Sequence, residues 1–287
     1  MQYKVSIKRK CYLLSVLLMT VWLTGCVQEE FESTPSPAGN GIRFTLTVPD
    51  VNLPSVSSRT MTGTGTAKKE DEIETVDILV FDMSKTPAVF LEWVSATGVT
   101  QDLADNSTVS FSAVLSPTTA STCIVVVANK ELDNIVSGFT KGATTKVEAM
   151  EKMLHTQTGK WLADGSTTGG YTRIPMYGEK VISKITPSMD PITGINMKRM
   201  LARIDIRNNS ATSNFTVEEV YLANYNTTGY IAPAWNTNGQ VTDPVPDTPV
   251  LPAGSGKMTE EGDAILYSVN GNTPYDGEIY TFESLAA

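Results

Sequence analysis

The chain has 287 residues, which is room for one large domain or two of modest size. It carries 22 basic and 31 acidic residues, a formal net charge of −9 that argues against a nucleic-acid partner, because phosphates require a basic surface. Three cysteines and one histidine offer neither a disulfide framework nor a pair of ligands at metal-binding spacing, so we expect no metal and no other cofactor.

The first 25 residues have the three-part build of a secretory signal. Four basic residues lie between Lys4 and Lys10, and an apolar run follows at residues 12–22. That run is shorter than the roughly 20 residues that a membrane-spanning helix needs. Leu23-Thr24-Gly25 then precedes Cys26. This pattern resembles the lipobox of bacterial lipoproteins, which implies cleavage before Cys26 and lipid on its thiol and amine. The alternative is an ordinary signal peptide with a chance cysteine.

Cleavage before Cys26 makes the exported chain more acidic. It removes four of the 22 basic residues and no acid, which leaves 18 basic against 31 acidic residues and a net charge of −13. Such a charge suits an exposed outer surface. Residues 26–40 are rich in Glu and Pro and have no apolar period, so we expect them to form a flexible tether.

The first strand that the sequence predicts lies at residues 42–48. Apolar and polar residues alternate there with period two, which is typical of a half-buried strand. Its inward side chains are expected to be those of Ile42, Phe44, Leu46 and Val48. Residues 55–69 have no apolar pattern and predict an exposed loop, in which Arg59 stands among small residues that leave it open to a protease.

The rest of the chain also has the patterns of a β protein. Further strands are predicted at residues 73–82, 89–94, 108–115, 123–128, the second half of 195–206, 215–222, 264–269 and 278–283. Two short helices are predicted at residues 132–136 and 145–155. In the second helix Thr145 and Glu148 form a capping box, and His155 is expected at the C-terminal end.

The sequence has few residues in patterns that are typical of a catalytic site. Cys123 lies in an apolar strand and is expected to be a free, buried thiol without a role in catalysis. The carboxylates of Glu74, Asp77, Asp82 and Glu92 are expected on solvated strand faces. A pair of carboxylates that acts in general acid–base catalysis remains an alternative, although nothing in the sequence favours it. We therefore expect a protein that is not an enzyme.

Several short motifs occur in an order that resembles one known family. They are, in chain order, Ser57-Ser58-Arg59-Thr60, the acidic lead Asp71-Glu72-Ile73 into a buried strand that ends at Phe81-Asp82, Val127-Ala128-Asn129, Ile174-Pro175-Met176-Tyr177-Gly178-Glu179, and Lys198-Arg199-Met200-Leu201-Ala202-Arg203-Ile204-Asp205. Together with the lipoprotein signal they resemble the fimbrillins of Bacteroidales, the FimA/Mfa-like subunits of type V pili. The match covers roughly residues 42–222, and the last two motifs are the more specific.

The resemblance implies an all-β fold with a minor helical part. It places a signal peptide at residues 1–25, a tether at 26–40, and two transthyretin-like β-sandwich domains at 41–190 and 195–287. The family's second domain has more strands than residues 195–287 supply. We therefore expect either a short variant or a truncated second domain, and the family's C-terminal donor strand has no clear counterpart here.

For function, the resemblance implies a structural subunit of a cell-surface fimbria. The subunit would be exported as a lipoprotein, held at the outer membrane through Cys26 and assembled with other pilin subunits. In this family an arginine-specific protease cuts a loop like the one that holds Arg59. The first strand, here the one with Ile42, Phe44 and Leu46, is then lost, and a strand from the next subunit fills the groove.

Two alternatives remain open at this point. In the first, the loop stays uncut and the first strand is kept, as in a membrane-anchoring subunit of a pilus. In the second, the chain is a monomeric surface lipoprotein adhesin that binds glycan or a host or bacterial surface protein. Trp93, Trp161 and Trp235 would be the candidates for an aromatic platform in that case.

Overall fold

Most of the regular secondary structure in the described ranges is β-strand, and nine of the strands form two sheets. The first sheet has the order β4-β5-β1-β9 and consists of β1 (Ile42–Thr47), β4 (Thr97–Gln101), β5 (Thr108–Ala113) and β9 (Ile192–Asn196). The second has the order β10-β8-β6-β2-β3 and consists of β2 (Val76–Asp82), β3 (Val89–Ser95), β6 (Thr122–Ala128), β8 (Met176–Ile182) and β10 (Lys198–Arg199). The predicted all-β class with a minor helical part is confirmed.

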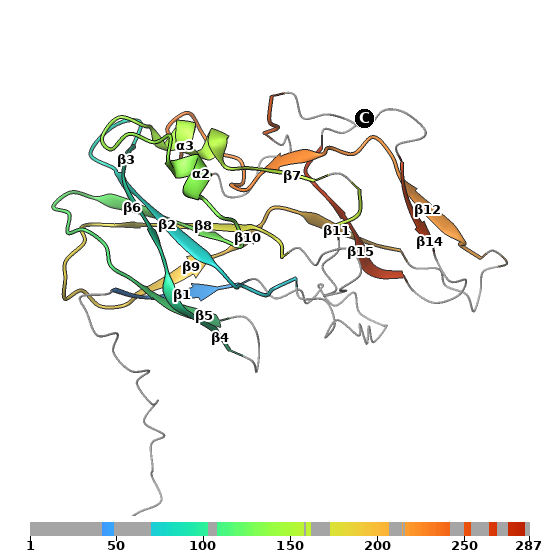
Figure 1. Ribbon diagram of the computed structural model, residues 1–287, viewed down its shortest axis with the longest axis horizontal. Helices are drawn as coiled ribbons and strands as arrows, with labels where there is room; N and C mark the ends of the chain where they lie inside the picture. The colour runs from blue at the N-terminus through green and yellow to red at the C-terminus, as the bar shows by residue number, and fades with distance from the viewer. Residues whose placement is uncertain are drawn as a thin grey trace, which may run out of the picture. The chain divides into compact units, whose positions relative to one another are not determined.

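The structure is a computed structural model, drawn in Figure 1. It describes residues 42–48, 70–102, 108–157, 159–161, 173–206, 214, 216–241, 250–253, 264–268 and 275–284. All of these belong to one compact unit that spans residues 40–287. Within these ranges, no helix is long and apolar enough to cross a membrane.

Six further strands pair two by two. β7 (Leu154–Thr156) pairs with β13 (Thr228–Tyr230), β11 (Ala202–Ile206) with β15 (Tyr275–Thr281), and β12 (Glu219–Leu222) with β14 (Ile265–Ser268). β9 and β10 pair with β1 and β8, so the two larger sheets take in strands as late as Arg199. The division of the chain into domains at 41–190 and 195–287 stays a prediction.

The two larger sheets pack face to face and enclose a hydrophobic core. The core contains side chains from β1, β5 and β9 on one side and from β2, β6 and β8 on the other. Alternate residues of β2 and β6 point into it, among them Ile78, Val80, Ile124 and Val126. This arrangement is a β-sandwich, in which the inner face of each sheet is removed from water by the other.

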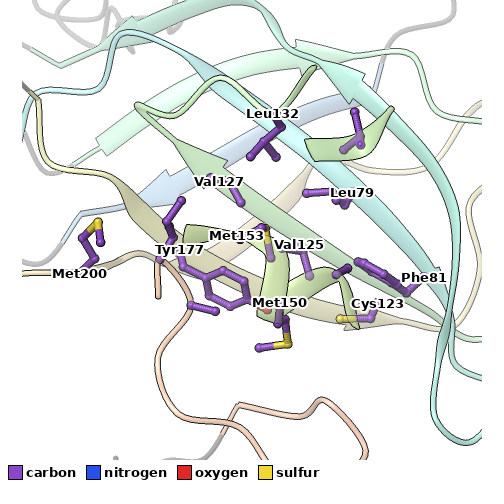
Figure 2. Packing of buried hydrophobic residues seen from close by; sticks show 14 of the residues in the cluster. Leu79, Phe81, Cys123, Val125, Val127, Leu132, Met150, Met153, Tyr177 and Met200 are labelled. Atoms are coloured by element: carbon purple, nitrogen blue, oxygen red, sulfur yellow. The ribbon is translucent and has the colours of Figure 1, made fainter. Parts of the chain in front are cut away.

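The second face of the five-stranded sheet is covered as well. Leu79, Val125 and Val127 point away from the sandwich core and pack against Met150 and Met153, as Figure 2 shows. The cover includes α2 (Asp133–Val136) and α3 (Lys146–Lys152), which lie on the side of the sheet opposite β1, β4 and β5 in Figure 1. A strand buried on both faces can be apolar at every position, which explains why β2 and β6 do not alternate.

The structure confirms the capping box of α3 and corrects the end of that helix. The Thr145 side chain accepts from the backbone N–H of Glu148, and the Glu148 carboxylate accepts from the N–H of Thr145. The helix was predicted to run through His155, but it ends at Lys152, and His155 lies in β7 opposite Gly229 of β13. The prediction was wrong because pairing with a distant strand overrides the local helical pattern there.

One strand carboxylate was also placed wrongly. Asp77 was expected on a solvated face, but it is only 7% exposed. Its Oδ1 accepts a hydrogen bond of 2.6 Å from Ser95 Oγ on the neighbouring strand β3. Burial raises the pKa of Asp77, and the bond from Ser95 opposes that shift. A partner on the adjacent strand thus makes the burial of this carboxylate possible.

Candidate functional site: the slot that holds strand β1

Strand β1 has hydrogen-bonding neighbours on both sides. It pairs antiparallel with β5 over six consecutive residues, from Ile42 opposite Ala113 to Thr47 opposite Thr108. On its other side it pairs in parallel with β9, and the register shifts between Phe44 and Leu46. The first of the described strands is therefore an internal strand of its sheet, with a regular ladder on one side and an irregular one on the other.

The side chains of β1 divide cleanly between core and solvent. The predicted inward residues are all buried, with exposed fractions of 4% for Ile42, 1% for Phe44, 0% for Leu46 and 1% for Val48. Phe44 stacks on Phe111 of β5 with ring centroids 5.0 Å apart and an angle of 6° between the rings. Burial of a side chain of this kind contributes about 1.5–3 kcal/mol, so β1 is a large part of the sandwich core.

The residues around β1 form a slot with apolar sides and an apolar floor. Phe111 of β5 and Ile195 of β9 flank the strand, and side chains of the facing sheet lie beneath it. The floor includes Ile78, Val80, Ile124 and Val126. If β1 were absent, this surface and the unpaired backbone of β5 and β9 would face water. An unfilled slot of this kind favours the addition of another strand.

A single stretch of chain, between Val48 and Glu70, joins β1 to the other described strands. The described chain leaves the sandwich at Val48 and resumes at the buried Glu70, which is 3% exposed. Because β1 is the first strand, one break between these residues would separate it from every other described strand without cutting any of them. Arg59 lies in that interval, and both Arg59 and Cys26 are outside the described residues.

The thiol and imidazole that the sequence singled out do not form a reactive pair. Cys123 is free and completely buried in β6, and burial raises the pKa of its thiol to about 11. His155 packs against Trp161, with ring centroids 4.9 Å apart, and burial lowers its pKa. A thiol with a raised pKa is a poor nucleophile near neutral pH. Among the described residues no group of three His, Cys, Asp or Glu side chains could hold a metal ion.

The three tryptophans proposed as a glycan platform are occupied in packing. Trp161 is buried, and Trp93 and Trp235 are partly buried against the same core that covers the outer face of the five-stranded sheet. Trp235 also meets Tyr230 edge to face, with ring centroids 4.8 Å apart. These rings do not form one exposed, flat surface of the kind on which a sugar could stack.

Sequence analysis identified β1 but missed the residues that form its slot. The alternation at residues 108–115 predicted a strand there, yet the pattern does not tell which strand is its neighbour. Phe111 and Ile195 were therefore not identified as flanking residues. An aromatic residue at an inward position of each strand, Phe44 and Phe111, was the one available signal for their pairing.

We predict that substitutions on the two faces of β1 differ strongly in effect. Leu46→Ala should lower the free energy of unfolding by about 2–5 kcal/mol, because it removes a buried side chain and leaves a cavity. Thr47→Ala, on the exposed face of the same strand, should change it by less than about 0.5 kcal/mol. Urea denaturation of the two variants measures the difference, and equal effects would show that β1 does not contribute to the core.

Comparison with known proteins identifies the family. The family model described as major fimbrial subunit protein (FimA) matches residues 42–245. Comparison with curated proteins found no match. A crystal structure of a fimbrial assembly protein from Parabacteroides distasonis has 11% sequence identity and a TM-score of 0.42, with 85% of this chain and 77% of that one covered. A crystal structure of a candidate cell adhesion protein from the same species has 16% sequence identity and a TM-score of 0.45, with 87% of this chain and 72% of that one covered. The family model matches most of the chain, which therefore belongs to the FimA family of major fimbrial subunit proteins, structural subunits of cell-surface fimbriae.

Proposed function

We propose that this fimbrial subunit is exported as a lipoprotein and assembled by exchange of strand β1 for a strand of a neighbouring subunit. The observation that carries the proposal is the position of β1. It is the first of the described strands, yet it lies inside a sheet and shares one side of the sandwich core with β5 and β9. One break after it releases it, and no other strand of the sandwich has this combination of position and connection.

The two neighbours of β1 suggest how a replacement strand would be recognised. The regular ladder with β5 offers main-chain hydrogen bonds over six residues, which any extended chain can use. The apolar floor accepts side chains only at alternate positions, so it selects strands with period-two alternation. A donor strand with an aromatic side chain opposite Phe111 would restore the ring stacking that Phe44 makes.

Arg59 is the candidate cleavage position, because small residues surround it in a stretch without apolar pattern. A cut there would leave Thr60 as the new N-terminus and keep Glu70 and everything that follows. In the alternative role of a membrane anchor, the same subunit would keep β1 and its lipid. The monomeric adhesin is less favoured, because the candidate tryptophans are packed against the core.

We predict that Arg59 controls assembly. Polymer-borne protein should begin at Thr60, and Arg59→Ala should leave an uncut monomer bound to the membrane. N-terminal sequencing of surface fimbriae, together with an SDS-resistant ladder on gels, measures both outcomes. Arg43→Ala is the matched control, since Arg43 lies within β1 and the protein should still be cut. Surface-assembled protein that still carries Ile42 and Val48 in one chain with the rest would identify an anchor instead.

We also predict that Cys26 is the lipidated N-terminus of the exported precursor. Mass spectrometry of the membrane-bound form should find acyl chains on Cys26, and Cys26→Ala should release the protein from the membrane. Several acyl chains hold a protein firmly where one holds it weakly, so the wild-type precursor should resist washing. A mature N-terminus at another residue, or unchanged membrane retention of Cys26→Ala, would contradict the lipoprotein assignment.

A further inference from the structure

A short acidic segment, residues 70–75, leads into β2 without being part of any strand. Its first residue, Glu70, is buried although it is charged, with 3% of its surface exposed. A carboxylate is removed from water at a high cost unless charged or hydrogen-bonding partners surround it. The partners of Glu70 therefore show which parts of the fold this segment connects.

Glu70 binds two strands that lie far along the chain. Nη1 of Arg203, in β11, lies 3.0 Å from Oε1 and 2.9 Å from Oε2 of Glu70. The hydroxyl of Tyr280, in β15, donates to Oε1 at 2.5 Å. Nε of Arg199 donates to the backbone carbonyl of Glu70 at 3.0 Å. β11 and β15 pair with each other, so one carboxylate contacts both strands of this pair.

The other end of the segment is fastened to the sandwich. Ile73 is buried in the sandwich core, and its N–H donates to the Gln101 side chain at 3.1 Å. Asn129, which follows β6 with a φ of 58°, donates from Nδ2 to the carbonyl of Glu72 and accepts from the N–H of Glu74. Asn is one of the few residues that adopt this conformation readily. Residues 72–74 are thus fixed to β4 and β6.

We propose that Glu70 is a latch that fastens the β11–β15 strand pair to the sandwich of the two larger sheets. A two-stranded sheet is marginally stable by itself, so β11 and β15 depend on contacts such as this one. The partners Arg199, Arg203 and Tyr280 all lie C-terminal to Glu70, and none is in β1. The latch therefore does not use β1, and it goes beyond strand exchange because it acts in the uncut chain as well.

Hydrogen exchange measured by mass spectrometry on the uncut chain tests the latch. Glu70→Gln should speed exchange in β11 and β15 by at least about tenfold, because it removes the ion pair between Glu70 and Arg203. Exchange in β2 and β6 should stay the same. Glu74→Gln is the matched control on the same segment, since the Glu74 side chain is 61% exposed and pairs with Arg173 outside the latch. It should leave β11 and β15 unchanged.

Two further variants separate the latch from a general loss of stability. Tyr280→Phe removes one hydroxyl and keeps the ring, and should speed exchange in the same two strands by a smaller factor. Leu46→Ala should speed exchange around β5 and β9 relative to β2, without a matching change in β11 and β15. Unchanged exchange in Glu70→Gln, an equal increase in β2 and β6, or loosening of β11 and β15 by Leu46→Ala would each overturn the proposal. None of these results bears on cleavage at Arg59.

Discussion

Burial of the five-stranded sheet on both faces is the constraint on which the rest of the structure depends. β2 and β6 are buried at nearly every position, which requires that both faces of the sheet are covered. The four-stranded sheet covers one face, and α2, α3 and segments from the C-terminal part cover the other. β1 is an internal strand of the four-stranded sheet. Its presence, or that of a replacement strand, therefore decides whether the face of the five-stranded sheet beneath it is shielded from water.

This constraint explains why a subunit that lost β1 without a replacement strand would not be stable. Removal of Phe44 and Leu46 from the core would expose the floor of the slot and split the four-stranded sheet between β5 and β9. Both consequences favour a new strand in the same place, either within a polymer or by aggregation. In the proposed exchange, the instability of the open sandwich would favour assembly with a neighbouring subunit.

Several motifs that carried the family resemblance make long-range contacts in the described part of the chain. In the segment at 174–179, the Tyr177 hydroxyl donates to Glu179, which also pairs with the buried Lys146 at 2.6 Å. Gly178 is needed because a Cβ there would lie 2.7 Å from Met197 Sδ and 2.8 Å from Ile195 Cγ2. Glu70, which directly precedes the acidic lead, pairs with Arg203 of the basic segment, although the two segments looked independent in the sequence. In the described part of the chain, the segments at 70–75, 174–179 and 198–205 thus each hold distant strands together.

Sequence alone predicted what depends on local pattern. It gave the alternation of β1, the continuous burial of β2, the capping box of Thr145 and the free buried thiol of Cys123. It missed the β7–β13 pair and the Glu70 latch, whose partners are 133 and 210 residues away, because a period says nothing of which strands are neighbours. Asp77 was misjudged for the same reason, since its partner Ser95 lies on another strand.

The central claim is that the slot of β1 accepts a separate strand, and complementation by a peptide tests it most directly. A chain that begins at Thr60 would be refolded with a synthetic peptide of residues 42–48, and the free energy of unfolding would be measured in urea. We predict stoichiometric binding and recovery of stability with this peptide. A peptide of the same composition with its alternation shifted by one residue should not restore stability, because its apolar side chains would face solvent. Equal stability with both peptides, or a stable sandwich without any peptide, would contradict the account.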